Sequence, residues 1–394
     1  MSKENVMENG VGLFVGININ ETHSMVSFLD VTAKEPQNIL FSDKKTTQDN
    51  PIPLSSWGQI SKSGDVAQTE TIVNFVATLI EYAKRLTKAT KINKVCIAVE
   101  DFRIDTLDAI AAIMMRLQYS REQWCVISHE ESFAYYAYNQ KRELYASGVM
   151  LLDYKADGIY AYLMSNGKYG DTELIMENRY NISGDNFKSV YEKNAGLETV
   201  MDDIMNWLSI PLQEHIISSI YLTGEGFNVE SFPEKLTRFF CNRRKVFAGQ
   251  NLFVKGACFG AYEESVIGTK ENVILACSNR VTTGIEVDIC ERGVAKRLRV
   301  IKPGTNWYTA RRRLDFILED VNVIRVILRP CNSNKESYEE IDISSIPYRK
   351  GKMTRIELDI KFNSDSRCTI TVKDKGFGDF VKSSGKIVSK DIEL

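Results

Sequence analysis

The hydrophobic pattern of this chain changes once along its length, and that change constrains the fold more than any single motif. Up to about residue 264, segments with the two-residue period of strands alternate with segments that have the 3.6-residue period of helices. From Asn272 to Lys382 almost no helical period remains, and eight short alternating runs follow one another between polar turns. The first pattern is typical of α/β architecture and the second of an antiparallel β-sandwich. We therefore expect a domain boundary at 265–272.

Length and composition are those of an ordinary globular protein. The 394 residues are 43% hydrophobic and 26% charged, which is enough material for two or three domains. Because 50 basic residues stand against 52 acidic ones, no overall charge favours nucleic acid or an anionic membrane as a partner. The N-terminus has no signal-peptide core, and no apolar run reaches the roughly 18 residues of a membrane span.

Cysteines and histidines give no sign of a metal or catalytic centre. Eight cysteines are scattered through strand-like runs without a C-x-x-C pair, and the three histidines lie far apart in the sequence. This usage favours reduced thiols in the cytoplasm over a disulfide frame, and no metal site is expected. Since no G-x-S-x-G motif or cysteine–histidine pairing is present, no catalytic residue is assigned.

One hairpin, Val149–Leu163, has the frame of a phosphate site. A buried strand ends in Asp153 and returns after a short turn as a second, alternating strand. Such a turn presents backbone N–H groups to a phosphate when it contains consecutive glycines, since only glycine lets the backbone approach closely. Here the turn runs over residues 154–158 and has a single glycine, Gly158. The frame is present, but most of its chemistry is missing.

Four other segments stand in a regular order around this hairpin. They are Gly16–Thr22, Ser128–Ser132 before an alanine- and tyrosine-rich helix, Asn181–Phe187, and Leu222–Gly226 with Lys255–Ala257. In this order, the five segments resemble the nucleotide-site motifs of the DnaK-type heat-shock chaperones of the actin-like ATPase superfamily. The strands at 311–330 and 355–378 resemble the peptide-binding sandwich of the same chaperones.

The resemblance implies a fold class and a division into domains. It predicts an α/β actin-like (ribonuclease-H-type) domain over residues 1–268, similar to a nucleotide-binding domain. An all-β sandwich resembling the chaperone peptide-binding domain follows over 272–382, and residues 383–394 form a polar tail. Residues 271–275 resemble a weakened interdomain linker. The adenine-clamping insert and the helical lid of the family have no counterpart in the sequence, so a bound peptide would exchange quickly.

Position by position, the resemblance places any nucleotide at eight residues: Asn18, Thr22, Glu130, Asp153, Gly158, Gly224, Gly226 and Gly256. Several departures weaken this site. Asn18 replaces the metal-organising Asp of the family motif, and residues 155–157 replace three glycines. Because metal-organising and phosphate-holding groups are lost together, we expect no efficient ATP hydrolysis. ATP or ADP with Mg²⁺ would bind weakly or not at all, and whether any enzymatic activity remains stays open.

The same resemblance places a hydrophobic peptide groove at six residues: Ile285, Val287, Val294, Phe316, Val326 and Leu328. An apolar slot between strands suits an extended peptide, because main-chain hydrogen bonds supply affinity and pockets read alternate side chains. The alternative, that these six residues are ordinary sandwich core, stays open. A concentration of basic residues over 296–313 is interpreted as a solvated face balanced by acidic neighbours, with an acidic partner or nucleic acid as the alternative.

Together these observations predict a divergent, lidless heat-shock-chaperone-like protein of the cytoplasm. It would act as a protein- or peptide-interaction module with a degenerate nucleotide site, and its partner would be a protein or an extended hydrophobic peptide. Two alternatives stay open. One is an active ATP-dependent chaperone with a remodelled site that uses Thr22, Glu130 and Asp153. The other is an actin-like scaffold or filament-forming protein.

Overall fold

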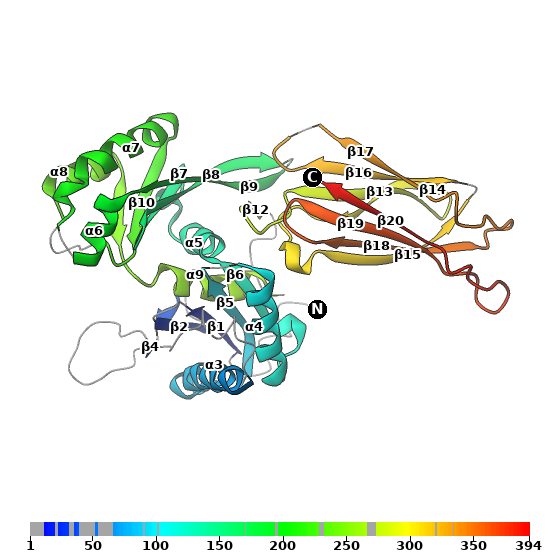
Figure 1. Ribbon diagram of the computed structural model, residues 1–394, viewed down its shortest axis with the longest axis horizontal. Helices are drawn as coiled ribbons and strands as arrows, with labels where there is room; N and C mark the ends of the chain where they lie inside the picture. Colours follow the sequence, from blue (N-terminus) through cyan, green and yellow to red (C-terminus); the bar gives the residue numbers. More distant parts are fainter. Residues whose placement is uncertain are drawn as a thin grey trace. The chain divides into compact units, whose positions relative to one another are not determined.

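The structure is a computed structural model, and it describes residues 12–19, 23–30, 35–38, 52–53, 66–89, 91–100, 102–169, 171–193, 196–227, 232–265, 273–319, 321–333 and 335–394. The chain divides into two units (Figure 1). Unit 1 comprises Met1–Asn166 and Glu177–Glu271, and unit 2 comprises Gly167–Met176 and Asn272–Leu394. Each unit is described by itself below.

The first sheet of unit 1 begins with a hairpin, which the alternating apolar runs at 11–30 predict. Its strands are β1 (Gly12–Ile19), β2 (His23–Asp30), β3 (Gln37–Asn38), β4 (Ile52–Pro53), β5 (Lys91–Val99) and β6 (Trp124–Ser128), in the order β3-β2-β1-β5-β6 with β4 beside β2. Strand β1 pairs antiparallel with β2 and parallel with β5, and β6 extends the sheet in parallel. The apolar runs that form β1 and β5 are buried on both faces, as expected for central strands.

Helices cover both faces of this sheet. They are α3 (Val66–Thr87), α4 (Ile104–Arg116), α5 (His129–Tyr138) and α9 (Leu252–Glu263). Figure 1 shows α3 and α9 on opposite sides of the sheet. Helix α9 packs on β1 and β5, and also on α5. The close approach of α9 depends on glycine, because a Cβ atom at Gly256 would overlap the carbonyl of Ser132 in α5.

A second sheet repeats the scheme of the first. Its strands are β7 (Gly148–Lys155), β8 (Gly158–Tyr169), β9 (Thr172–Ser183), β10 (Ile217–Thr223), β11 (Lys245–Ala248) and β12 (Val273–Ala276), in the order β11-β10-β7-β8-β9-β12. The series β8-β7-β10-β11 repeats β2-β1-β5-β6, with an antiparallel first pair and parallel pairs after it. Such a duplicated sheet is what the actin-like prediction requires. The prediction of an α/β N-terminal domain is confirmed.

The helices of the second sheet share one hydrophobic core with it. They are α6 (Asp185–Lys193), α7 (Met201–Glu214) and α8 (Glu234–Cys241). Phe187, Leu208 and Phe240 bring these three helices into contact with Leu152 and Ile220 of the strands. The sequence pattern predicts a helix up to Leu208, whereas α7 continues through Pro211 to Glu214. It does not predict β9 or β11.

Unit 2 contains two four-stranded antiparallel sheets. The strands are β13 (Thr283–Glu291), β14 (Val294–Ile301), β15 (Arg311–Leu318), β16 (Val323–Pro330), β17 (Ser337–Asp342), β18 (Thr354–Phe362), β19 (Arg367–Asp374) and β20 (Ile387–Glu393). One sheet has the order β14-β13-β16-β17 and the other β15-β18-β19-β20. The tip of the β8–β9 hairpin also belongs to this unit, where residues 173–176 pair in parallel with β12. A predominantly β C-terminal region is confirmed.

The prediction of a polar tail over 383–394 is wrong. Seven residues of this segment form β20, which pairs antiparallel with β19 from Lys373↔Ile387 to Arg367↔Glu393. An edge strand is held mainly by backbone hydrogen bonds to one neighbour, so it needs few apolar side chains. Only Ile392 of β20 is buried. Composition therefore gives little sign of the strand.

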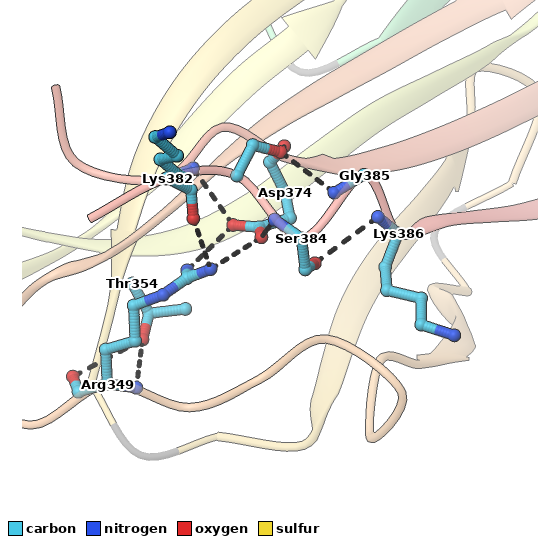
Figure 2. Close-up of polar contacts among 9 residues, drawn as sticks. Arg349, Thr354, Asp374, Lys382, Ser384, Gly385 and Lys386 are labelled. Carbon is cyan, nitrogen blue, oxygen red and sulfur yellow. Dashed lines mark hydrogen bonds and ion pairs between the residues drawn. The ribbon is translucent and has the colours of Figure 1, made fainter. Parts of the chain in front are cut away.

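The loop before β20 is fixed by a buried carboxylate, Asp374 (Figure 2). Both guanidinium nitrogens at the end of Arg349 donate to it, at 2.8 and 2.7 Å. The backbone N–H groups of Gly376 and Ser384 donate to the same carboxylate, at 3.0 and 2.6 Å. The Arg349 hydrogen bonds, aided by those of Ser384 and Gly376, hold the pKa of Asp374 well below its usual range. This cluster ties two loops of unit 2 together.

Candidate functional site

In unit 1, the ends of four strands bring most of the predicted polar site residues to one place. Asn18 lies near the end of β1, Glu100 follows β5, His129 and Glu130 follow β6, and Asp153 lies near the end of β7. These strands end on the same side of their sheets because β5 and β6 run parallel to β1, as β10 does to β7. The predicted residue Thr22 lies outside the described residues. The others can be placed.

The centre of this site is Lys155, the last residue of β7. Its ammonium nitrogen lies 2.5 Å from Oε1 of Glu100 and 3.6 Å from Oδ2 of Asp153. Burial lowers the pKa of this ammonium, but Asp153 and Glu100 outweigh burial, and the net pKa of Lys155 is raised. One protein cation therefore pairs with carboxylates from two sheets.

Burial is the main influence on the pKa of Asp153, whose side chain is almost entirely inaccessible to solvent. Burial raises its pKa to about 6, against the opposing attraction of Lys155. The effect of burial prevails because Lys155 lies closer to Glu100 than to Asp153. At Glu100, which is more exposed, the balance is reversed: burial raises its pKa, but Lys155 outweighs burial and leaves the pKa lowered. Sequence reasoning identifies Asp153 but misses both of its charged neighbours.

Helix α5 presents two further groups from its first turn. Ser128 caps the helix: its hydroxyl accepts from the N–H of Glu131 at 3.2 Å, and Glu131 Oε2 accepts from the N–H of Ser128 at 2.8 Å. Glu130, in the same turn, pairs with Arg179 of β9 at 3.2 Å. Arg179 is a second cation that the sequence pattern does not reveal, since its strand is not predicted either.

His129 is a buried, neutral base in this site. Burial lowers its pKa to about 4, so the imidazole is uncharged at neutral pH. Its ring stacks on Phe253 with centroids 4.0 Å apart, and Nε2 lies 2.8 Å from Oδ1 of Asn18. Nε2 therefore carries the proton and donates to the Asn18 amide oxygen, while Nδ1 has no hydrogen-bond partner among the described residues. Asn18, which the resemblance places at a possible nucleotide site, is hydrogen-bonded to a histidine.

The predicted glycines lie against protein atoms. A Cβ atom at Gly226 would overlap the ring of Tyr154, and one at Gly224 would overlap the Tyr154 backbone. Gly158 is equally close to the carbonyl of Ile182, and Gly256 contacts α5 as described above. Tyr154 is itself fixed, because its hydroxyl donates to the carbonyl of Phe187 at 3.0 Å. The role of these glycines in nucleotide binding stays a prediction, but each already serves the packing of the protein.

Unit 2 contains a cavity of about 630 Å³ between its two sheets. Its walls come from β13, β15, β16 and β18, together with the loop between β15 and β16. Three apolar side chains in its wall are also exposed to solvent: Ile317 is 52%, Val321 45% and Val323 44% exposed. Exposed branched aliphatic residues gathered around one cavity mark a surface suited to binding.

The six predicted groove residues do not form one groove. Val287 and Phe316 line the cavity. Ile285, Val326 and Leu328 are buried in the core, as the alternative interpretation holds, and Val294 is 66% exposed and lies outside the cavity lining. Val294 follows the β13–β14 turn at Arg292–Gly293, where neither sheet covers it. The basic residues at 296–313 mostly face acids: Arg299 pairs with Glu286, Arg297 with Glu336, and Arg311 with Asp359.

The described residues show neither a metal-binding cluster nor a membrane-spanning helix. Among the described residues, no cluster of three or more His, Cys, Asp or Glu side chains could hold a metal ion. Within the same part of the chain, the helices are too short or too polar to cross a bilayer.

The fold and these sites define a two-unit protein, with a duplicated α/β unit and a unit of two antiparallel sheets. Residues 60–278 match the model of a family described as "Family of unknown function (DUF5716) C-terminal". Since this match spans more than half of the chain, the protein belongs to that family. Residues 280–394 match a domain of unknown function (DUF8552). A search of curated proteins found no match.

Solved structures with some similarity are Ppx/GppA proteins of Aquifex aeolicus. The type II crystal variant of the Ppx/GppA phosphatase is 13% identical, with a TM-score of 0.35, covering 54% of this chain and 67% of that one. A second structure of the Ppx-GppA enzyme is 12% identical, with a TM-score of 0.33, covering 54% and 68%. A third, of the family member from the same organism, is 12% identical, with a TM-score of 0.34, covering 68% and 94%. These values are too low to establish a shared fold or activity.

Proposed function

We propose that this protein is a non-catalytic interaction module that holds an extended apolar segment of a partner protein in the cavity of unit 2. The observation that carries the proposal is the group of exposed aliphatic residues, Ile317, Val321 and Val323, in the cavity wall. Three exposed aliphatic residues at one site lower the solubility of a protein unless a ligand covers them. Their position therefore favours a ligand-binding role.

The strands around the cavity favour an extended ligand. Among the described residues, strand β15 lies at the edge of its sheet and pairs with β18 on one side. An edge strand has backbone N–H and C=O groups free on one side, and an extended peptide can add to them as a further strand. Side chains of such a peptide alternate in direction, so every second one could enter the cavity.

The charges around the cavity favour an apolar segment over a charged one. Its lining includes the acids Asp288, Asp315 and Glu319 and the bases Arg325 and Lys352. These charges are largely neutralised within the protein, since Lys352 pairs with Glu319 at 2.5 Å and Asp315 pairs with Arg355 at 2.6 Å. No surplus of either sign remains to select a basic or an acidic peptide. The balanced charges of the lining support a peptide-binding role. From the sequence motifs alone, we also propose that the protein is chaperone-like and cytoplasmic.

In this proposal, unit 1 is a scaffold with a degenerate nucleotide site. The carboxylates of Asp153 and Glu100 already share the Lys155 ammonium, and the turn after Asp153 lacks the glycines that would hold a phosphate. A magnesium nucleotide would have to displace this ammonium and pay for desolvation of the buried charges. Calorimetric titration with Mg·ATP should therefore show no saturable binding, and binding with tight affinity would contradict this part of the proposal.

The peptide site can be tested by substitution at the cavity mouth. Short peptides rich in Leu and Ile should bind the full chain, whereas peptides in which these residues are replaced by Ser should not. Ile317→Asp and Val323→Asp should weaken binding about tenfold or more, because each removes apolar contact and adds a charge, a loss of about 1.4 kcal/mol. Val294→Asp is the matched control, since Val294 is exposed but lies outside the cavity lining. Equal loss in all three variants, or no binding to wild type, would overturn the proposal.

A further inference from the structure

Two cysteines lie side by side in the first sheet of unit 1. Strands β5 and β6 are parallel neighbours, and Cys96 is paired with Cys125 in their register. Paired residues on neighbouring strands direct their side chains to the same face of the sheet. Cys96 is part of the hydrophobic cluster beneath α9, and Cys125 packs against the same cluster. Neighbouring strands are about 4.8 Å apart, and disulfides form at Cα separations of roughly 4.4–6.8 Å.

The two thiols differ in accessibility. Cys96 is fully buried, whereas Cys125 is partly exposed. Burial raises the pKa of Cys96 well above its usual value, so this thiol stays protonated and inaccessible. An oxidant in solution therefore meets Cys125 first, and Cys96 is placed to react second. The third thiol of this cluster, Cys258, already donates a hydrogen bond to the carbonyl of Phe14 at 3.5 Å.

We propose that Cys96 and Cys125 are a redox pair that hydrogen peroxide converts reversibly into a disulfide. In the first step, the Cys125 sulfur attacks one peroxide oxygen, the O–O bond breaks, and one water leaves with the thiol proton. In the second step, the Cys96 sulfur attacks the Cys125 sulfenic acid. The S–S bond forms, the S–O bond breaks, and a second water leaves with the Cys96 proton. The two thiols lose two electrons in total, and the peroxide is reduced to two waters.

The position of this pair connects it with the candidate site. The chain continues from Cys96 to Glu100, and from Cys125 to His129, over the same number of residues. A disulfide would therefore fix the separation of the two strands that end at these site residues. Unit 2 has three buried thiols among its described residues. Cys277 and Cys331 follow the ends of their strands, and Cys368 is in register with Phe362 and Ile392 rather than with a cysteine. This inference is independent of the proposed peptide site, because it concerns unit 1 alone.

The test is peptide mapping of the full chain after brief exposure to hydrogen peroxide. Remaining thiols are blocked with N-ethylmaleimide before digestion, so that new disulfides cannot form during the work-up. We expect a linked peptide containing Cys96 and Cys125, lighter by two hydrogen atoms than the sum of its parts, which disappears on treatment with dithiothreitol. Cys125→Ser should abolish this peptide, whereas Cys258→Ser, the control from the same cluster, should leave it.

The readout on the wild-type chain does not depend on whether any variant folds. Oxidation of Cys125 to the sulfinic or sulfonic acid without linkage to Cys96 would overturn the proposal, as would a Cys96 that stays unmodified while other cysteines pair. A linkage that forms only after unfolding in urea would also overturn it, since it would show that the native pair cannot react.

Discussion

At the scale of single residues, two buried carboxylates show how differently one fold can treat the same group. Asp153 is buried with its cation at 3.6 Å, and burial raises its pKa to about 6. Asp374 is equally buried but accepts two hydrogen bonds from Arg349 and two from backbone N–H groups, which lower its pKa. Burial alone therefore does not determine the charge of a carboxyl group. The number and distance of its donors do.

Asp153→Asn should change the pH dependence of the stability of unit 1. In the wild type the folded state binds the Asp153 proton more tightly than the unfolded chain, so stability is lost as pH rises from about 4 to about 6. Asparagine does not titrate. The free energy of unfolding of the variant, relative to that of the wild type, should therefore rise across this interval by about 1–3 kcal/mol at most. Urea denaturation at several pH values measures the difference. Asp105→Asn, at an exposed position of α4, is the control. If the stability of the variant relative to the wild type falls with rising pH, the raised pKa is contradicted.

Asp374→Asn should have the opposite pH dependence. Because the folded-state pKa of Asp374 is lowered, its contribution to stability is fully present at neutral pH and is lost as pH falls below about 4. The variant leaves Arg349 without its anion, which should cost about 3 kcal/mol at pH 7. In acid the variant and the wild type should converge. Thermal unfolding of unit 2 at pH 7 and pH 3 tests this, with Asp379→Asn in the exposed loop as the control. An equal loss at both pH values would exclude an ionic cause.

At the scale of elements, the contact between α5 and α9 depends on the absence of one Cβ atom. A Gly→Ala change inside a helix is normally favourable by about 1 kcal/mol. Gly256→Ala should instead destabilise unit 1 by about 1–3 kcal/mol, because the new methyl group would overlap the carbonyl of Ser132 and force the helices apart. Denaturant unfolding measures the sign directly. Gly249→Ala is the control, since the nearest atom to its Cβ would lie 3.8 Å away. A stabilising Gly256→Ala would show that the helices can adjust freely.

The sequence predicts those elements whose buried faces carry a regular pattern of apolar side chains. The helical period over 66–89 and the apolar run at 94–100 predict helix α3 and strand β5 to within a few residues. Strand β9 buries only Leu174 and Ile175, and β20 only Ile392, so backbone pairing forms these strands without a clear pattern. The site follows the same rule. Asp153 is visible as an acid at the end of an apolar run, but its link through Lys155 to Glu100 joins positions 55 apart. This link exists because the folded chain brings the ends of β7 and β5, from two different sheets, close together.

At the scale of the whole molecule, the question is whether unit 1 can control a ligand of unit 2. Coupling between two sites requires that one ligand bind two states of the protein with different affinity. Two carboxylates of the candidate site in unit 1 already pair with Lys155, and its glycines pack on Tyr154, Ile182 and Ser132. Among the described residues, the metal of a nucleotide would have to compete with the Lys155 ammonium for Asp153 and Glu100. We therefore expect that unit 1 does not respond to a nucleotide.

We accordingly predict that peptide binding by the full chain is independent of Mg·ATP. The Kd of a Leu-rich peptide, measured by fluorescence anisotropy, should be the same with and without saturating Mg·ATP, because a ligand that does not bind cannot shift an equilibrium. Lys155→Ala is the informative variant, since it removes the ammonium from between Glu100 and Asp153. If the tethered cation is what excludes the nucleotide metal, this variant should show weak Mg²⁺-dependent stabilisation that the wild type and Lys155→Arg lack. A tenfold change in wild-type peptide affinity, about 1.4 kcal/mol, would show instead that the two units are coupled through a nucleotide.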